Sequence, residues 1–176
     1  ISLNPAGDRA FVALGTGDLA VLDTGTGRIL RTTHVGLISA YPPVFISHGL
    51  AYAMSFGDVT SSGAIVSRTS AMLRVLDAHD GALLRTVLVG VNPSWPPLPD
   101  APGRRLFFSS TGPTDNVNAF PSGPGTVSVV DAATSRLLRK IAVGIGPSPI
   151  GLDPASGHLL VLNAQGDGTA PPSPAR

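Results

Sequence analysis

A 54-residue repeat is the feature that most constrains this chain of 176 residues. Three similar segments end in Val-Leu-Asp at Asp23, Val-Leu-Asp at Asp77 and Val-Val-Asp at Asp131, with the same interval between successive aspartates. A turn and a further apolar segment follow each aspartate, and that segment ends in Val-Gly at Gly36, Gly90 and Gly144. Such a period predicts an array of similar units that stack on one another.

Each copy contains four short apolar segments separated by turn residues, which is typical of antiparallel strands. First strands are expected at residues 1–3 and 150–152. Second strands are expected at 10–14, 50–54, 106–109 and 158–162. Third strands are expected at 19–22, 72–76 and 126–130, and fourth strands at 29–35, 83–89 and 137–143. Glu is absent and Lys140 is the only lysine, so the helix formers Glu, Lys and Gln are nearly missing, and the 21 Gly and 17 Pro indicate a turn-rich chain.

Four antiparallel strands per repeat predict a β-propeller blade, because one small twisted sheet buries both faces only when it stacks on neighbours. A flat β-sandwich is the alternative, but a 54-residue period does not predict it. We therefore expect an all-β fragment of about three and a half blades over residues 1–163. The copies are 1–36, 37–90, 91–144 and a partial copy at 145–163, and 164–176 form a Pro/Gly-rich loop or tail.

The third copy resembles the YVTN-type β-propeller repeat. The matching segments are 126–134 (TVSVVDAAT), 141–144 (IAVG), 146–147 (GP), 152–154 (LDP) and 159–163 (LLVLN). This resemblance implies blade-shaped repeats that often act as binding scaffolds in secreted, periplasmic or surface proteins. Quinoprotein dehydrogenase-like and lactonase-like propellers share the same superfamily pattern. The resemblance supplies no catalytic residue to carry over.

Charge and composition argue against several functional classes. The net charge is +1 and the arginines are dispersed, so no nucleic-acid partner is expected. No apolar stretch of the sequence is long enough to predict a membrane span, and no cysteine can ligate zinc. The four histidines are scattered along the sequence, and His34 stands alone near a strand end. No two of them have the spacing of a metal-binding pair. We expect no metal, no cofactor and no catalytic residue.

The candidate site is a ligand-binding face formed by the connections between second and third strands. Insertions at 55–70 and 110–125 share this face with two aromatic-Pro-Pro segments, and such loops on a rigid scaffold commonly carry binding residues. The predicted ligand-binding residues are Tyr41, Trp95, Asp58, Arg68, Asp115, Asn116, Asn118 and Phe120. Alternatively, Tyr41 and Trp95 pack between blades, and the insertions have no role in binding because longer loops cost little stability. The carboxylates of Asp18, Asp58, Asp115 and Asp167 could surround a hard cation, but no calcium-loop spacing occurs.

The sequence thus predicts a non-catalytic binding scaffold outside the cytoplasm, whose partner is a small molecule or a protein. The alternative is a fragment of a propeller enzyme whose catalytic residues lie in other blades. Two copies of three and a half blades would close a seven-bladed disc as a homodimer. The aspartates 23, 77 and 131 are expected to accept hydrogen bonds from turn amides. The arginines 9, 28, 104 and 136 are expected on solvated turns.

Overall fold

The computed structural model describes residues 1–36, 44–55, 71–92, 96–100, 102–112, 123–153 and 155–165, and these residues form strands and turns without a helix. The first sheet has the order β1-β2-β3-β4 and the second the order β5-β6-β7-β8. The third sheet has the order β13-β12-β11-β10-β9. All pairings are antiparallel. The strands are β1 (Ser2–Leu3), β2 (Arg9–Ala13), β3 (Asp18–Asp23), β4 (Ile29–His34), β5 (Val44–Ser47), β6 (Leu50–Ser55), β7 (Ala71–Asp77), β8 (Leu83–Gly90), β9 (Leu98–Pro99), β10 (Arg105–Ser110), β11 (Pro124–Asp131), β12 (Leu137–Leu152) and β13 (Leu159–Gln165).

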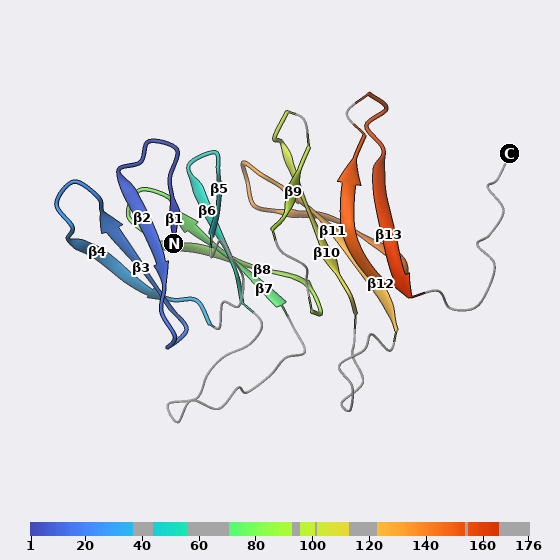
Figure 1. Ribbon diagram of the computed structural model, residues 1–176, viewed down its shortest axis with the longest axis horizontal. Coiled ribbons are helices and arrows are strands. Elements are labelled where there is room, and N and C mark those ends of the chain that lie inside the picture. The colour runs from blue at the N-terminus through green and yellow to red at the C-terminus, as the bar shows by residue number, and fades with distance from the viewer. Residues whose placement is uncertain are drawn as a thin grey trace, which may run out of the picture.

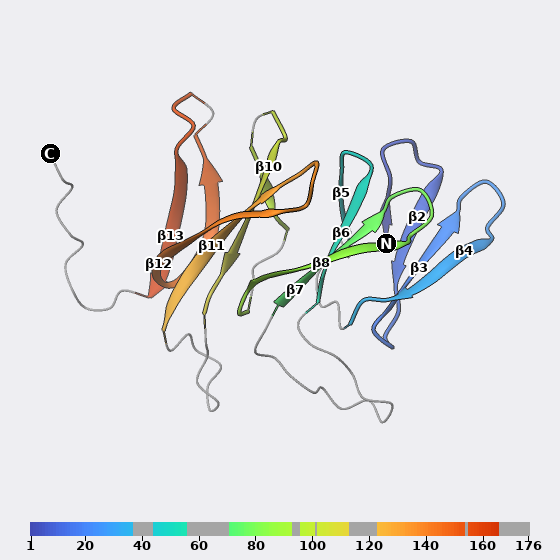
Figure 2. The same cartoon turned by 180° about the vertical axis from the view of Figure 1, so that it is seen from behind.

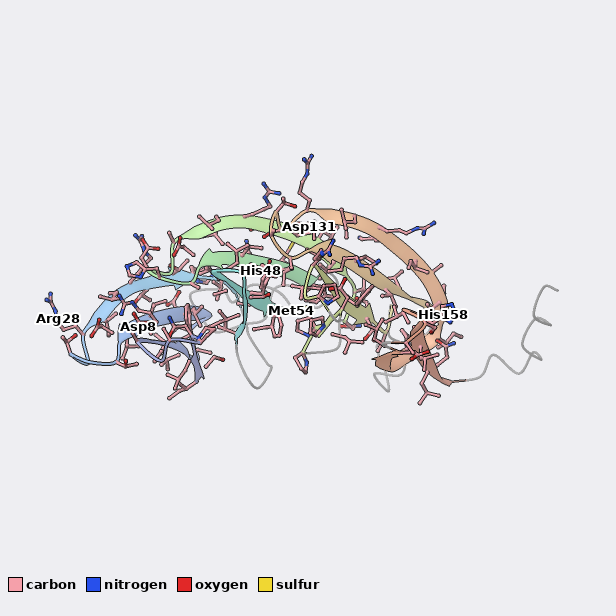
Figure 3. All side chains as sticks on the ribbon, turned by 90° about the horizontal axis from the view of Figure 1, so that it is seen from above. Asp8, Arg28, His48, Met54, Asp131 and His158 are labelled. Carbon is pink, nitrogen blue, oxygen red and sulfur yellow. The ribbon has the colours of Figure 1, made fainter. Side chains whose placement is uncertain are left out.

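The three sheets stand side by side and follow the chain from one end of the molecule to the other (Figure 1). Seen from above, β4, β8 and the first part of β12 lie along one convex arc (Figure 3). The first two sheets are therefore one blade each of a fan, and the five-stranded third sheet contains the third blade and the beginning of a fourth. This arrangement confirms the prediction of stacked four-stranded units, with strands close to the expected positions.

The register shows that the blades are true repeats. In each sheet an aromatic residue of the second strand is paired with a valine of the third strand. The pairs are Phe11 with Val21, Tyr52 with Val75, and Phe107 with Val129. The equal spacing of the three valines in the sequence is thus the spacing of one structural position from blade to blade.

The strand β12 differs from the expectation of two separate strands at 137–143 and 150–152. It runs through both without a break, pairing with β11 as far as Ile145 and with β13 from Ile145 onward. Extended backbone is compatible with the fixed φ of the proline at position 147, so the link remains a strand. A register shift between Pro147 and Ile150 absorbs the irregularity. The third sheet thereby carries its own fourth strand and the first two strands of the next blade.

The hydrophobic core forms three clusters, two between neighbouring sheets and one within the third sheet. Phe11, Leu19 and Val21 of the first sheet pack against Ala51, Ala53 and Leu76 of the second. Tyr52, Met54, Leu73 and Val75 pack against Leu106, Phe108 and Val130 of the third. Phe107, Val127 and Val129 are covered by Leu159 and Val161 of β13. In the second sheet, alternate residues such as Ala51 and Tyr52 face opposite neighbours, as a sheet covered on both faces requires.

Arginines join each blade to the turn of the next one. Arg31 of β4 donates from Nε to the carbonyl oxygen of Asp80, at 3.2 Å, in the β7–β8 turn. Arg85 of β8 donates from Nη1 to the carbonyl oxygen of Thr134, at 3.1 Å, in the β11–β12 turn. Seen from behind, the β11–β12 turn reaches toward β8, and the β7–β8 turn reaches toward β3 and β4 (Figure 2).

The sequence suggested that Arg9 lies on a solvated turn, but the structure places it in β2 with a largely buried side chain. Its side chain is only 12% exposed, and Nη1 lies 2.9 Å from Oδ2 of Asp23. Its Nε donates to the carbonyl oxygen of His79, at 2.9 Å, in the second sheet. The prediction was wrong because the β7–β8 turn leans over the first blade and encloses this side chain. Arg28, Arg104 and Arg136 are exposed, as expected.

Candidate ligand-binding face

All eight predicted ligand-binding residues lie outside the described residues. They are Tyr41, Trp95, Asp58, Arg68, Asp115, Asn116, Asn118 and Phe120. Their roles in binding stay predictions. The described residues that flank them define the edge of the sheets from which the insertions start.

We call this edge the loop edge, and it is where the second strands end and the third strands begin. Its described members include Asp18, Ser55, Ser110 and Pro124, at the ends of β3, β6, β10 and β11. These strand ends point toward the same side of the fan, the lower side in Figure 1. The ends of both predicted insertions therefore share one side of the molecule.

A His–Asp pair occupies the loop edge of the first blade. Nδ1 of His34 lies 2.9 Å from Oδ1 of Asp18, and the hydroxyl of Thr16 donates to Oδ2 of Asp18 at 2.8 Å. The hydrogen bonds from His34 and Thr16 hold the pKa of the Asp18 carboxyl below its usual value. The sequence suggested that His34 stands alone near a strand end. This expectation was wrong, because the β3–β4 register places His34 opposite Asp18.

The base of the second insertion is braced by hydrogen bonds between two blades. Asn92, which follows β8, has a φ of 50° and donates from Nδ2 to the carbonyl oxygen of Gly112, at 3.0 Å. The amide and the hydroxyl of Thr111 both donate to the carbonyl oxygen of Asn92, at 3.0 and 3.1 Å. Sequence analysis missed this brace, since an Asn before a proline reads only as a turn. The chain enters residues 113–122 from a fixed position.

The other end of that insertion is equally confined. A Cβ at position 112 would lie 2.5 Å from the carbonyl oxygen of Pro124, and a Cβ at position 125 would lie 2.3 Å from Cδ of Pro147. Only glycine fits such close backbone approaches without a shift of the neighbours. Gly112 and Gly125 therefore allow both ends of the insertion to lie in close contact with the backbone and prolines of the third sheet.

The recurring Val-Gly at the end of each fourth strand has a packing function at this edge. A Cβ on Gly90 would lie 2.1 Å from Oγ of Ser110, and a Cβ on Gly144 would lie 2.6 Å from Cγ of Asn163. Ser110 and Asn163 both lie near the ends of second strands. The glycine allows the fourth strand of one blade to approach the polar second-strand end of the next.

At the opposite edge of the sheets, the turns between third and fourth strands are held by side-chain hydrogen bonds. Oδ1 of Asp131 accepts from the amides of Ala133 and Thr134, and Oδ1 of Asp23 accepts from the amide of Thr26. Oδ1 of Asp77 accepts from the amide of His79 at 2.7 Å. These contacts confirm the expected turn role of the three aspartates. They also explain the repeated Val-Leu-Asp, since each turn begins with the same side-chain acceptor.

The described residues contain no group of three or more His, Cys, Asp or Glu side chains placed to hold a metal ion. In this part of the chain there is also no helix of the length and apolar character that crosses a membrane.

Comparison with solved structures identifies the fold. The chain matches the hydrazine synthase of Kuenenia stuttgartiensis with a TM-score of 0.56 and 17% identity, over 90% of this chain and 47% of that one. It matches the dihydro-heme d1 dehydrogenase NirN in complex with DHE with a TM-score of 0.58 and 15% identity, over 92% of this chain and 31% of that one. A Dos1 propeller also matches, with a TM-score of 0.43 and 9% identity, over 90% of this chain and 50% of that one. No protein-family profile and no curated protein sequence matches.

The sheets and these similarities together define the class of protein. The chain is part of a β-propeller, made of antiparallel four-stranded blades. It spans less than half the length of the hydrazine synthase and dehydrogenase chains that it matches. At 15 and 17% identity the likeness extends to the fold alone.

Proposed function

We propose that this chain is part of a non-catalytic, YVTN-like propeller scaffold that binds a small molecule or a protein at the loop edge. The observation that carries the proposal is the fixed base of the second insertion. Asn92, Gly112 and Gly125 hold both of its ends against rigid sheets. Fixing the two ends of a loop removes part of the conformational entropy that its residues would otherwise lose on binding.

The chemistry at the loop edge favours a polar ligand. The Asp18 carboxylate and the His34 imidazole supply hydrogen-bonding groups on an exposed surface. Trp95 and Tyr41 would add aromatic area, since these residue types are common in binding hot spots. We further propose that the protein acts outside the cytoplasm, as the resemblance to YVTN-type repeats implies.

The sole tryptophan provides the test. Trp95→Ala is expected to weaken ligand binding with little change in the thermal melting of the chain. Binding would be followed by calorimetry against small-molecule and glycan libraries, and hits would be repeated with the variant. If Trp95 instead packs between blades, its truncation will cost about 3–5 kcal/mol of unfolding free energy, and a loss of that size would overturn its binding role.

A propeller enzyme is the second candidate. Two of the structural neighbours, hydrazine synthase and the dihydro-heme d1 dehydrogenase, carry the names of enzymes, and the chain covers less than half of each. The sequence that adjoins this chain in its gene discriminates the two proposals. A Cys-x-x-Cys-His motif, or His and carboxylate side chains lining the central channel, would favour the enzyme.

A further inference from the structure

The outer edge of the second blade is open although this blade has a neighbour on each of its faces. Its core residues pack against the first sheet on one face and against the third sheet on the other. The fourth strand β8 pairs with β7, and no described strand lies on its other side. This edge lies on the outer, convex side of the fan (Figure 3), so it does not result from where the chain begins or ends. Its backbone amides and carbonyls can pair with an added strand.

The side chains of β8 lack most of the charges that protect such an edge. Natural edge strands are commonly blocked by charged residues, above all by lysine. The fourth strand β4 carries the ionisable residues Arg31 and His34, and the first part of β12 carries Arg139 and Lys140. In β8 the only charged residue is Arg85. Of the three described fourth strands, β8 is thus the one best suited to accept a partner strand.

One face of β8 offers apolar side chains beside the open edge. Leu83 is paired with Leu76, which belongs to the hydrophobic cluster between the first two sheets. Leu88 follows Val87, which packs toward the third sheet, so alternation turns Leu88 toward the first sheet as well. Leu83 and Leu88 are 43% and 46% exposed, although both neighbouring sheets are present. Apolar side chains of an added strand would lie directly beside them.

The other face of β8 is bordered by cations. Arg85 points toward the third sheet, where its Nη1 donates to the carbonyl oxygen of Thr134 at 3.1 Å. Lys140 is the cross-strand partner of Ser128, whose hydroxyl donates to the carbonyl oxygen of Val89 in β8. Since partners across a sheet share a face, Lys140 lies on the face of the third sheet that is turned toward β8. Both cations are exposed, and acidic side chains would complement them.

The other charged groups around β8 keep this preference for acidic side chains. Arg74, on the face toward the first sheet, donates from Nη1 to the hydroxyl of Thr86 at 3.0 Å. The carboxylate of Asp80, in the turn before β8, lies 3.3 Å from Nη2 of Arg31. Asp77, in the same turn, accepts hydrogen bonds from turn amides. Both acids are thus engaged, and the described surroundings of β8 carry an excess of positive charge.

We propose that the outer edge of β8 binds an extended segment of a partner protein that is apolar on one face and acidic on the other. We call β8, with Leu83, Leu88, Arg85 and the neighbouring Lys140, the strand-acceptor edge. The segment pairs with the backbone of β8 by β-augmentation, places apolar side chains beside Leu83 and Leu88, and directs carboxylates toward Arg85 and Lys140. This contact uses neither the two insertions nor the His–Asp pair, so it is separate from the proposed loop-edge site.

A second copy of the chain is a poorer occupant of this edge. Two β8 strands could pair with their equivalent faces on the same side, and Arg85 and Lys140 of the two copies would then repel each other. They could instead pair with opposite faces on the same side, and the leucines of each copy would then lie beside the cations of the other. A strand with one apolar and one acidic face avoids both conflicts.

A short, blocked and fluorescently labelled peptide in which glutamate and valine alternate is the probe. In an extended strand this alternation places the valines on one face and the glutamates on the other. Fluorescence anisotropy against the full chain should show saturable binding with one peptide per chain. Hydrogen exchange should show slower exchange of β8 amides when the peptide is present. A control peptide of alternating lysine and valine should bind at least about tenfold more weakly, because the cations beside β8 repel it.

Variants of matched exposure locate the contact on the chain. Leu88→Ala should weaken binding of the glutamate–valine peptide about threefold to fivefold, the effect of one cross-strand apolar contact. Leu30→Ala should leave binding unchanged, since Leu30 is also 46% exposed but lies on β4. Lys140→Ala should weaken binding about threefold and reduce its dependence on salt, whereas Arg28→Ala in the first blade should change neither. Circular dichroism melts check that all four variants remain folded.

Several results would overturn the proposal. One is an absence of saturable binding of the glutamate–valine peptide, and another is equal affinity for the wild-type chain and Leu88→Ala. A third is tighter binding of the lysine–valine peptide, because the edge would then not select acidic side chains. A fourth is a stable dimer in light scattering that Leu88→Ala converts to monomer, because a second copy of the chain would then occupy the edge.

Discussion

Gly27 and Gly81 hold the same place in successive blades, and their surroundings make them a matched pair. Both have positive φ, 71° and 77°. A Cβ on Gly27 would meet nothing within 4 Å, whereas a Cβ on Gly81 would lie 2.4 Å from Cγ2 of Val21 in the preceding blade. The requirement for glycine is conformational at Gly27 and both conformational and steric at Gly81.

Gly81→Ala should therefore destabilise the chain more than Gly27→Ala. The left-handed conformation alone costs alanine about 1–2 kcal/mol, which applies to both variants. Overpacking against Val21 adds about 1–3 kcal/mol at Gly81. Urea unfolding of the two variants measures this difference directly. Equal free energies of unfolding would show that the β7–β8 turn moves away from Val21 at little cost.

Tyr52 links the second and third blades through a buried hydroxyl. The hydroxyl donates to the carbonyl oxygen of Ala132 at 2.7 Å, and the ring belongs to the core between the two sheets. Tyr52→Phe should cost about 1–3 kcal/mol, because it leaves that buried carbonyl without its donor. Thermal unfolding at pH 7 is the measurement, and an unchanged melting temperature would contradict the prediction.

The same residue predicts a stability change at alkaline pH. Burial raises the pKa of Tyr52 above its ordinary value of 10.0. The unfolded chain therefore loses this proton at a lower pH than the folded chain, and stability falls as the pH rises above about 10. In Tyr52→Phe this part of the fall should be absent. Unfolding free energies between pH 8 and pH 11 should converge for the two proteins, and parallel curves would be the contrary result.

The aspartates that begin the turns between third and fourth strands should make the stability of the chain depend on pH in the acid range. Hydrogen bonds from the amide and hydroxyl of Thr134 hold the pKa of Asp131 below its ordinary value of 3.8. A carboxyl with a lowered pKa in the folded state stabilises above that value, and this stability is lost as the pH falls through the lowered pKa. Asp131→Asn retains an acceptor oxygen but cannot titrate. Its unfolding free energy should depend less on pH between 4 and 2 than that of the wild-type chain, and an equal dependence would refute this.

The strands were predictable from the sequence because alternation and turn residues mark them locally. The third strands repeat the same Val positions, and their partners follow from the antiparallel register. The continuity of β12 was not predictable, because Pro147 and Gly146 normally signal a break. Arg9 and His34 were misplaced for a related reason, since their partners come from another strand or blade. The eight predicted binding residues lie outside the described residues, so their arrangement stays a prediction from the sequence.

At the scale of the molecule, the position of a blade in the array decides what each of its residues contributes. The second sheet is covered by a neighbouring sheet on both faces, and its core residues belong to two clusters. The outward face of β13 has no such cover among the described residues, where Leu162 is 61% exposed. Stability in stacked repeats is a sum of units and interfaces, so equivalent positions need not carry equal energies.

Met54 and Leu162 test this directly, since they hold the same repeat position in β6 and β13, at equal distances in the sequence after Gly49 and Gly157. Met54 is fully buried against the third sheet, and Met54→Ala should cost about 2–5 kcal/mol. Leu162→Ala should change the unfolding free energy by less than about 0.5 kcal/mol, because its side chain is already exposed to solvent. Chemical unfolding of both variants under one set of conditions gives the comparison. A large loss for Leu162→Ala would mean that this face is covered in solution, by the C-terminal residues or by another molecule, and the measured size of the loss would report how much of the leucine that cover buries.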